Sequence, residues 1–258
     1  MDKLLIIDGN NLLFQMFYGI PNKIYNKNGE TNHATIGFIS YVIKIIKKFE
    51  ITKCCVVFDK DTNKKRKELH NDYKSNRVIN WNELPQDEVP FNEEVKIIKC
   101  LDYLGIKTLY SSNMEADDLI ASITKSFDNS NEIIISSFDS DFFQLINENV
   151  KVLRCRGKNL QIYDLDYFIE KFGFTPDKYV LYKAIVGDTA DNINGIYSIG
   201  PKRTTNLLKT YNNIEEMKIS KVVDKYKDLI LTNLDLVYRN IKLIKLEQSE
   251  NLVFDINY

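Results

Sequence analysis

Acidic residues form the most informative pattern in this sequence, because they recur in short clusters whose oxygens could bind metal ions. Three aspartates each follow a short apolar run: Asp8 after residues 4–7, Asp59 after residues 54–58, and Asp139 shortly after residues 133–135. Further acids gather at residues 115–118, 139–141 and 187–191. Ligand sets made only of oxygens suit Mg²⁺ or Mn²⁺.

These clusters predict a particular kind of chemistry if they meet in space. Like charges packed together need protonation or cations to coexist. Two divalent ions about 4 Å apart can clamp an in-line displacement at phosphorus, which makes phosphodiester hydrolysis the natural reaction. Each cluster taken alone could have a purely structural role, because acidic residues are favoured in the first turn of a helix and Asp191 could be an N-cap.

The apolar runs and the segments between them indicate how the acids are positioned. The runs read as buried strands of a parallel sheet, and residues 35–49 and 93–104 have the period of amphipathic helices. This alternation predicts an α/β fold with a central, mostly parallel sheet flanked by helices. Ligands bind at the carboxyl ends of such strands, so we expect Asp8, Asp59 and Asp139 to converge there.

Composition excludes several classes of protein. The chain of 258 residues has a formal net charge of −1, which argues against coating nucleic acid by bulk charge. No apolar run approaches the roughly 18 residues that span a bilayer, and the N-terminus lacks the pattern of a signal peptide. We therefore expect a compact, monomeric, cytoplasmic protein that makes no membrane contact.

Cysteine and histidine give no support for zinc or redox chemistry. The four cysteines lack paired metal-ligand spacing, and Cys54 and Cys55 lie in an apolar run where buried thiols are common. His33 and His70 have no partner at ligand spacing, so we expect them to be surface or local hydrogen-bonding residues.

Charge is distributed unevenly between residues 60 and 94. Basic residues dominate residues 60–77, whereas residues 83–94 are acidic. The stretch 76–92 holds Pro85, Pro90 and the only tryptophan, Trp81, and it is a poor candidate for core structure. We expect an excursion from the core with a basic half and an acidic half.

Residues 195–200, the end of a glycine-containing loop at 187–200, have the glycine spacing of a nucleotide-binding P-loop. Pro201 stands where the lysine should be, and a helical region precedes the loop where a strand is required. The better interpretation is a tight hairpin between two helices, in which Gly195 and Gly200 permit turn dihedrals. Lys202, Arg203 and the amides of the second helix would then meet a DNA phosphate.

The motifs resemble, in order and spacing, those of the flap-endonuclease family, which includes the 5′ nuclease domain of bacterial DNA polymerase I and stand-alone bacterial and phage flap endonucleases. The matching pieces are LLIIDGNN (4–11), VVFD (56–59), YKSNR (73–77), EADDLIA (115–121), DSDFFQL (139–145) and KAIVGDTADNINGIYSIGPKRTTNLL (183–208). The last piece is long and highly specific.

The resemblance implies two metal sites built from acids. It assigns Asp59, Glu115, Asp117 and Asp139 to the first ion, Asp141, Asp188 and Asp191 to the second, and a supporting role to Asp8 and Asp118. It also implies Mg²⁺ or Mn²⁺ as the two ions. Potassium on backbone carbonyls of the hairpin is a further expectation.

The resemblance also implies how DNA is held. Residues 64–94 correspond to the family's helical arch, where Lys74 and Arg77 are catalytic basic residues that bond the scissile phosphate. Their spacing of three places them on one helical face. Tyr73 is expected to stack on a base and Arg66 to contact phosphate. The hairpin corresponds to a helix-hairpin-helix, with Gly195, Gly200, Lys202, Arg203 and Thr204 as DNA-binding residues.

The predicted protein is a structure-specific 5′ nuclease, with 5′-3′ exonuclease and flap endonuclease activity in DNA replication and repair. Its partners would be flapped, branched or nicked DNA and RNA primers. We expect a PIN-like nuclease core at residues 1–182 and a helix-hairpin-helix region at 183–258. No polymerase domain follows, as in a free-standing enzyme or a piece of a longer chain. The alternatives are a PIN-type ribonuclease, a haloacid-dehalogenase-type phosphatase, because of Asp139-Ser140-Asp141, and an inactive DNA-binding module.

Overall fold

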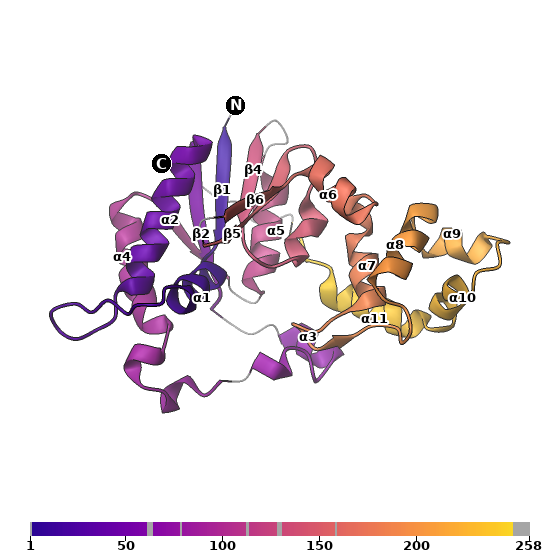
Figure 1. Cartoon of the computed structure of the whole chain (residues 1–258), viewed down its shortest axis with the longest axis horizontal. Helices are drawn as coiled ribbons and strands as arrows, with labels where there is room; N and C mark the ends of the chain where they lie inside the picture. The colour runs from indigo at the N-terminus through magenta and orange to yellow at the C-terminus, as the bar shows by residue number, and fades with distance from the viewer. Residues whose placement is uncertain are drawn as a thin grey trace.

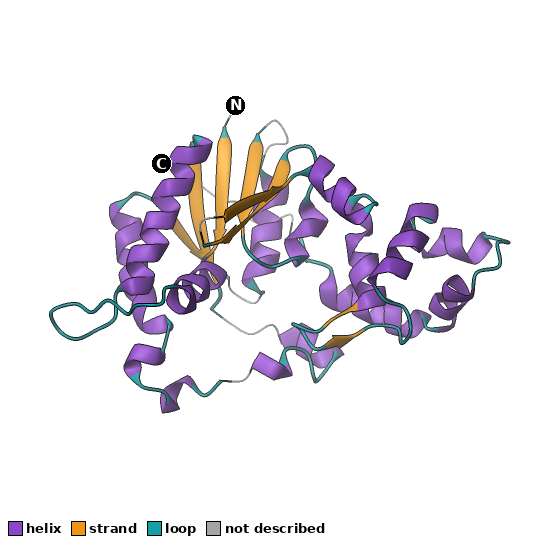
Figure 2. Ribbon diagram, viewed as in Figure 1, coloured by secondary structure: helices purple, strands orange, loops and turns teal. Residues whose placement is uncertain are grey.

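A mixed sheet forms the centre of the molecule (Figures 1 and 2). The computed structural model describes residues 2–60, 64–77, 79–111, 114–127, 131–157 and 159–249, apart from the side chains of Lys64, Lys65 and Arg77. Within these residues the sheet has six strands in the order β3-β2-β1-β4-β5-β6. The strands are β1 (Lys3–Asp8), β2 (Lys53–Phe58), β3 (Lys107–Tyr110), β4 (Glu132–Ser136), β5 (Val150–Arg156) and β6 (Asn159–Tyr163).

The strand directions confirm the predicted sheet. Strands β1 to β5 are parallel, and only the pairing of β5 with β6 is antiparallel. The chain order reverses between β1 and β4, which are neighbours although β2 and β3 separate them in sequence. In open α/β sheets ligands bind in the crevice at such a reversal, outside the carboxyl ends of the strands.

Helices cover both faces of the sheet, and the alternation of side chains along β1 decides which face each residue serves. Leu5 and Ile7 pack with α1 (Gly9–Gly19), α2 (His33–Phe49) and α4 (Phe91–Tyr103). Leu4 and Ile6 pack with α5 (Ala116–Ser126), α6 (Leu165–Phe172) and α7 (Tyr179–Val186). Figure 1 shows α2 and α4 on one side of the sheet and α5 and α6 on the other. A strand buried on both faces explains the unbroken apolar runs in the sequence.

The C-terminal part is helical and lies at one end of the molecule (Figure 1). It consists of η5 (Pro176–Lys178), α8 (Pro201–Thr210), α9 (Ile214–Ile219), α10 (Lys225–Thr232) and α11 (Leu234–Ile244). A two-stranded ribbon of β7 (Gly187–Asp188) and β8 (Ile193–Asn194) stands between α7 and α8. Helix starts at Pro176 and near Lys202 agree with the sequence.

The arch, defined here as residues 64–94, is less regular than expected. Its described elements are α3 (Lys64–Leu69), η1 (Ser75–Arg77), η2 (Trp81–Glu83), η3 (Gln86–Glu88) and the start of α4. Lys74 lies in a turn ahead of η1 with φ of 54°, so the prediction that Lys74 and Arg77 share a helical face is wrong. The physical reason is that the Lys74 amide bonds to the carbonyl of Asp191 rather than to a preceding turn.

The far end of the arch is held by aromatic and buried polar contacts. The Trp81 ring packs edge-on against Phe91 and Phe14, at centroid distances of 5.4 and 5.9 Å. His33 is buried rather than at the surface, and its Nδ1 lies 3.2 Å from the carboxylate of Glu93. These contacts join the end of the arch to α1 and α2.

The described helices include none long and apolar enough to cross a membrane. Cys54, Cys55 and Cys155 are buried, and Cys100 is partly buried. Their positions agree with a role in the core.

Candidate active site

Acids from three strands meet at the reversal between β1 and β4. Asp8 ends β1, Asp59 follows β2, and Asp139 lies three residues beyond β4. Burial, together with the nearby charges of Asp139 and Asp59, raises the pKa of Asp8 to about 6. The structure therefore places these carboxylates close enough to repel one another.

Short polar side chains fix the loops that carry these acids. Asp8 caps α1 by accepting a 3.1 Å hydrogen bond from the Asn11 amide, and Ser137 donates to its second oxygen at 2.8 Å. The side chain of Asn10 accepts from the Asp59 amide at 2.7 Å. Because these bonds reach across two strand ends, the DGNN motif sets the spacing of the acids as well as supplying one of them.

Gly9 has a steric reason to be glycine. A Cβ on Gly9 would lie 2.7 Å from the ring of Phe58. The start of α1 can therefore approach the end of β2, which brings Asp8 toward Asp59.

Helix α5 adds three further acids, but the structure gives each a different environment. Burial raises the pKa of Asp117 well above its ordinary value, and Asp139 and Asp8 add to this. Burial would also raise the pKa of Glu115, but Lys74 and Arg66 lower it below the ordinary range. Asp117 thus belongs with the strand-end acids, whereas Glu115 is paired with the arch.

One carboxylate oxygen of Glu115 accepts hydrogen bonds from three side chains of the arch. Oε2 accepts from Arg66 at 2.5 Å, from the Lys74 ammonium at 3.1 Å and from the Tyr73 hydroxyl at 3.3 Å. Burial would lower the pKa of Lys74, but Glu115 and neighbouring acids raise it overall, so the side chain is cationic. Glu115 is therefore the link between the arch and the acidic site.

Asp118 is paired with Arg66, which also bonds to Glu115. Its Oδ1 accepts from Arg66 at 2.7 Å and from the Glu247 amide at 2.8 Å, and the residue is fully buried. The expected supporting role of Asp118 thus takes the form of an anchor for the base of the arch and the segment after α11.

The acids expected at the second ion form the tightest group. Ligand atoms of Asp141, Asp188 and Asp191 all lie within 4.8 Å of one another, and no other group of three metal-binding side chains meets that limit among the described residues. Asp141 opens η4 (Asp141–Leu145), Asp188 ends β7, and Asp191 lies in the turn between β7 and β8. The acids expected at the first ion are not gathered this closely.

A buried lysine lies inside this group. Lys183 of α7 is 5% exposed, and its ammonium bonds to Asp141 and to Asp188, the latter at 2.5 Å. Burial would lower the pKa of Lys183, but the two carboxylates raise it. Burial nevertheless raises the pKa of Asp141 to about 7, with Asp139 and Asp191 acting in the same direction. The site holds more negative charge than one lysine neutralises.

The donor set fits divalent metal ions. It consists of carboxylate oxygens, the ligands that Mg²⁺ and Mn²⁺ prefer. The raised pKa values of Asp8, Asp117 and Asp141 show that the full charge is costly without cations. An Asp cluster is thus positioned to bind metal.

Two predicted DNA contacts are turned inward in this structure. Arg66 is 4% exposed and also bonds to the Lys245 carbonyl, and Tyr73 is 3% exposed. Both side chains are packed against Glu115. The side chain of Arg77 lies outside the described residues.

The predicted hairpin is present, but its glycines serve a different purpose from the one expected. Gly195 has no positive φ; a Cβ there would lie 2.2 Å from the backbone of Val186. Gly200 has a φ of −99°, and a Cβ on it would meet nothing. Between Gly195 and Gly200 the left-handed position is Ser198, with φ of 69°. Close approach, and not turn geometry, requires Gly195.

The predicted contacts of α8 differ in exposure. Lys202 is exposed in the first turn, whereas Thr204 is buried and bonds to the Gly200 carbonyl at 3.2 Å. Arg203 bonds to the Ser198 carbonyl and lies 4.5 Å over the ring of Tyr226. Lys202 and Arg203 are thus both exposed, but the Arg203 guanidinium is already bonded within the protein.

Several functional residues were missing from the sequence interpretation. Lys183 is one, and the signal for it was a single charge within the apolar run of residues 179–186, since a buried lysine requires acidic partners. Asn10, Ser137 and Ser111 are others; Ser111 donates to Asp59 at 2.9 Å. These small polar residues carry no distinctive spacing.

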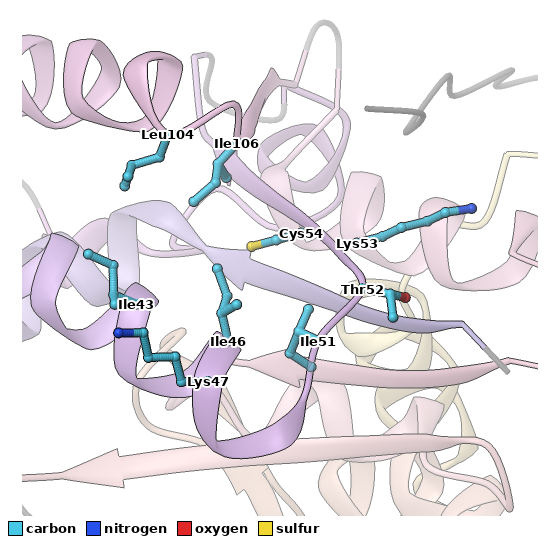
Figure 3. A pocket seen from close by; sticks show the side chains of 9 residues that line it. All are labelled: Ile43, Ile46, Lys47, Ile51, Thr52, Lys53, Cys54, Leu104 and Ile106. Atoms are coloured by element: carbon cyan, nitrogen blue, oxygen red, sulfur yellow. The ribbon is translucent and has the colours of Figure 1, made fainter.

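An apolar hollow elsewhere is not part of this site. It is lined by Ile43, Ile46, Ile51, Cys54, Leu104 and Ile106, with neighbouring polar residues (Figure 3). It lies at the amino ends of β2 and β3, opposite the carboxylates.

Comparison with protein families covers the whole chain. Residues 3–173 match the model of a 5′-3′ exonuclease N-terminal resolvase-like domain, and residues 174–258 match the 5′-3′ exonuclease C-terminal SAM fold. The chain is 33% identical over 257 residues to a 5′-3′ exonuclease of Aquifex aeolicus, covering 97% of this chain and 86% of that protein. It is also 33% identical to DNA polymerase I of Deinococcus radiodurans, covering 84% of this chain but only 22% of that protein.

Solved structures share the fold. The flap endonuclease of bacteriophage T5, in a complex with DNA and metal ions, has a TM-score of 0.76 at 24% identity, covering 95% of this chain and 89% of that chain. Flap endonuclease-1 from Methanococcus jannaschii has a TM-score of 0.63 at 18% identity, covering 96% and 80%. The resemblance stated from the motifs is confirmed by these matches.

Proposed function

Because this chain belongs to the 5′-3′ exonuclease family, we propose that it is a metal-dependent, structure-specific 5′ nuclease that cleaves phosphodiester bonds of flapped or 5′-ended DNA. The observation that carries the proposal is the gathering of Asp141, Asp188 and Asp191 beside the strand-end acids. An acidic site of this kind serves phosphoryl chemistry, because it can hold cations against a phosphate.

Mg²⁺ or Mn²⁺ is the proposed cofactor, bound at two sites. The acids of one site are gathered more closely than those of the other. Asp141, Asp188 and Asp191 would hold one ion, and Asp59, Glu115, Asp117 and Asp139 the other, with Asp8 buried behind them. When bound, such ions would activate water and neutralise the charge that develops on the phosphate. Potassium on carbonyls of the hairpin remains a proposal for the DNA-binding region.

The arch supplies the cationic side chain of the reaction. The Lys74 ammonium lies 3.1 Å from Glu115, which holds it at the edge of the acidic site. Its raised pKa keeps it protonated, so it can donate to a phosphate oxygen as negative charge develops there. Arg77 is proposed to act beside it, and Tyr73 to contact a base once the arch releases it.

The chain is proposed to divide its work between a nuclease core at residues 1–182 and a DNA-binding region at 183–258. Lys202 at the start of α8 would bind the backbone of the duplex, while the arch accommodates the 5′ end. Phosphate contacts of this type set position and do not read sequence. RNA primers attached to DNA are further candidate substrates.

A cleavage assay tests the proposal directly. With Mg²⁺, the protein should release a short product from a 5′-flapped duplex, and Asp139→Asn should abolish cleavage while largely retaining binding. Asp177→Asn changes an exposed aspartate and is the matched control. Undiminished cutting by Asp139→Asn, or cutting of single-stranded RNA alone, would overturn the assignment and favour a PIN-type ribonuclease.

A further inference from the structure

Tyr197 has an unusual position at the tip of the hairpin between β8 and α8. Its side chain is 92% exposed, while its neighbours Ile196 and Ile199 are 5% and 3% exposed. Single exposed apolar residues are common on protein surfaces and need no explanation by themselves. The backbone conformation around Tyr197, in contrast, does need an explanation.

The tip is a tight turn with a strained residue beside Tyr197. The Ile199 amide donates to the Ile196 carbonyl at 3.1 Å, which closes a four-residue turn. Ser198, its third residue, has φ of 69°. A turn of this type favours glycine at that position, because a side chain disfavours the left-handed conformation.

The positively charged side chain of Arg203 stabilises the strained turn. Arg203 donates to the Ser198 carbonyl, and its guanidinium lies 4.5 Å from the centre of the Tyr226 ring. With Ile196 and Ile199 buried on either side, the turn is held in one shape. A rigid, exposed tyrosine offers a large contact area at low cost in conformational entropy, as in binding sites.

The surroundings of Tyr197 fit a polyanion. Residues 192–214 contain no aspartate or glutamate, but they include Lys202, Arg203 and Lys209. Lys202 is exposed in the first turn of α8, five residues after Tyr197. A phosphodiester backbone presents anionic oxygens for the lysine and sugar rings for a flat aromatic side chain.

The hairpin also connects Tyr197 rigidly to the acids. Asp188 lies on β7 of the same ribbon, and Asp191 in the turn that follows. The fully buried Asn240 donates to the carbonyls of Ala184 and Asn194, at 2.9 and 2.8 Å. A contact made by Tyr197 is thus transmitted to the carboxylate cluster without an intervening flexible segment.

We propose that Tyr197 packs against the sugar-phosphate backbone of the duplex part of the substrate and sets the distance from that contact to the cleaved bond. The inference rests on the proposed DNA substrate and adds a positioning residue to it. Losing the ring should weaken duplex binding and broaden the choice of cleavage position, because Lys202 alone fixes only one point of the backbone.

The test compares Tyr197→Ala with Tyr103→Ala, which removes an equally exposed tyrosine, also 92%, at the end of α4. Fluorescence anisotropy in an Asp139→Asn background measures Kd for a labelled 5′-flapped duplex and for a single strand of equal length. We expect Tyr197→Ala to raise the duplex Kd by about tenfold, within the range for an aromatic contact with nucleic acid, and to leave the single-strand Kd unchanged. Tyr197→Phe should retain most of the affinity, and Tyr103→Ala all of it.

Cleavage mapping provides the second measurement. Tyr197→Ala in the otherwise unchanged enzyme should cut the same flap at additional neighbouring positions. Unchanged duplex Kd and cleavage pattern, or an equal loss on the single strand, would overturn the proposed contact. If the unaltered protein cleaves no DNA, the proposed function itself fails, whatever Tyr197→Ala does.

Discussion

The main-chain amide of Lys74 donates a 3.1 Å hydrogen bond to the main-chain carbonyl of Asp191. The bond joins the base of the arch to the loop that carries two acids of the tight cluster. Asn192, the next residue, adds side-chain bonds to the Asp72 carbonyl at 2.9 Å and to Ser75 at 3.1 Å. Movement of the arch is therefore coupled to the position of these acids.

Lys74→Ala should slow the chemical step more than it weakens binding. The ammonium acts on charge that develops in the transition state, so its loss should lower the single-turnover rate by about 100-fold or more, as for other donors of this kind. Quench-flow on a saturating flap substrate measures the rate. Lys67→Ala, an exposed lysine of α3, is the control. A change in Kd alone would show that Lys74 only binds substrate.

Asn192→Gly should loosen the base of the arch without straining the loop. Asn192 has φ of 57°, which glycine adopts freely, so the substitution removes only the side-chain bonds. We expect faster hydrogen exchange at residues 72–76, measured by mass spectrometry. Ser198→Gly replaces another left-handed residue, beyond β8, and it should leave exchange at residues 72–76 unaltered. Equal exchange rates at residues 72–76 in the two variants would contradict the coupling between the arch and the loop that carries Asp191.

Lys183→Met should destabilise the metal-free protein and increase its response to metal. Removing one partner of a buried ion pair costs about 3–5 kcal/mol, and here it leaves Asp141 and Asp188 unpaired. An added divalent ion would then bind these oxygens without competition from the ammonium. Tm measured with and without Mn²⁺ should show a larger gain than in the unaltered protein. Lys209→Met, at an exposed lysine, is the control. If Mn²⁺ raised the Tm of both variants equally, competition between the metal and the Lys183 ammonium would be refuted.

The metal-free protein should lose stability as the pH rises through about 6 to 7. The pKa of Asp8 is raised from 3.8 to about 6 and that of Asp141 to about 7. The folded protein therefore binds more protons than the unfolded chain, and this stabilisation, present below pH 4, is lost above the folded pKa values. For Asp8 it amounts to about 3 kcal/mol. Tm in EDTA should fall between about pH 4 and pH 7, and Asp8→Asn should flatten the curve.

Arg66→Met should act on stability and not on the salt dependence of DNA binding. Its guanidinium is buried between Glu115 and Asp118, so the substitution should cost about 3–5 kcal/mol of unfolding free energy in a denaturant titration. The slope of log K against log salt should stay constant, whereas Lys202→Ala should reduce it by about one. A reduced slope for Arg66→Met would instead support the predicted contact between Arg66 and a DNA phosphate.

Local sequence patterns determined the main features of the fold. Apolar runs bounded by Asp8, Asp59 and Asp139 indicated parallel strands, because strands buried on both faces must be apolar throughout. The carboxyl ends of such strands lie at one edge of a sheet, so the approach of these acids followed from the pattern. The order and spacing of the motifs indicated the family.

Only the tertiary structure decided which charges neutralise one another. Arg66 lies 49 residues from Glu115 in sequence and 52 from Asp118, and Lys183 lies 42 from Asp141. Sequence spacing fixes neighbours within one helix or strand, but pairs this distant depend on how α3 packs on α11 and how α7 packs on α11 and η4. For the same reason the sequence assigned Arg66 to DNA, while the fold uses its charge to hold two buried carboxylates beneath the arch.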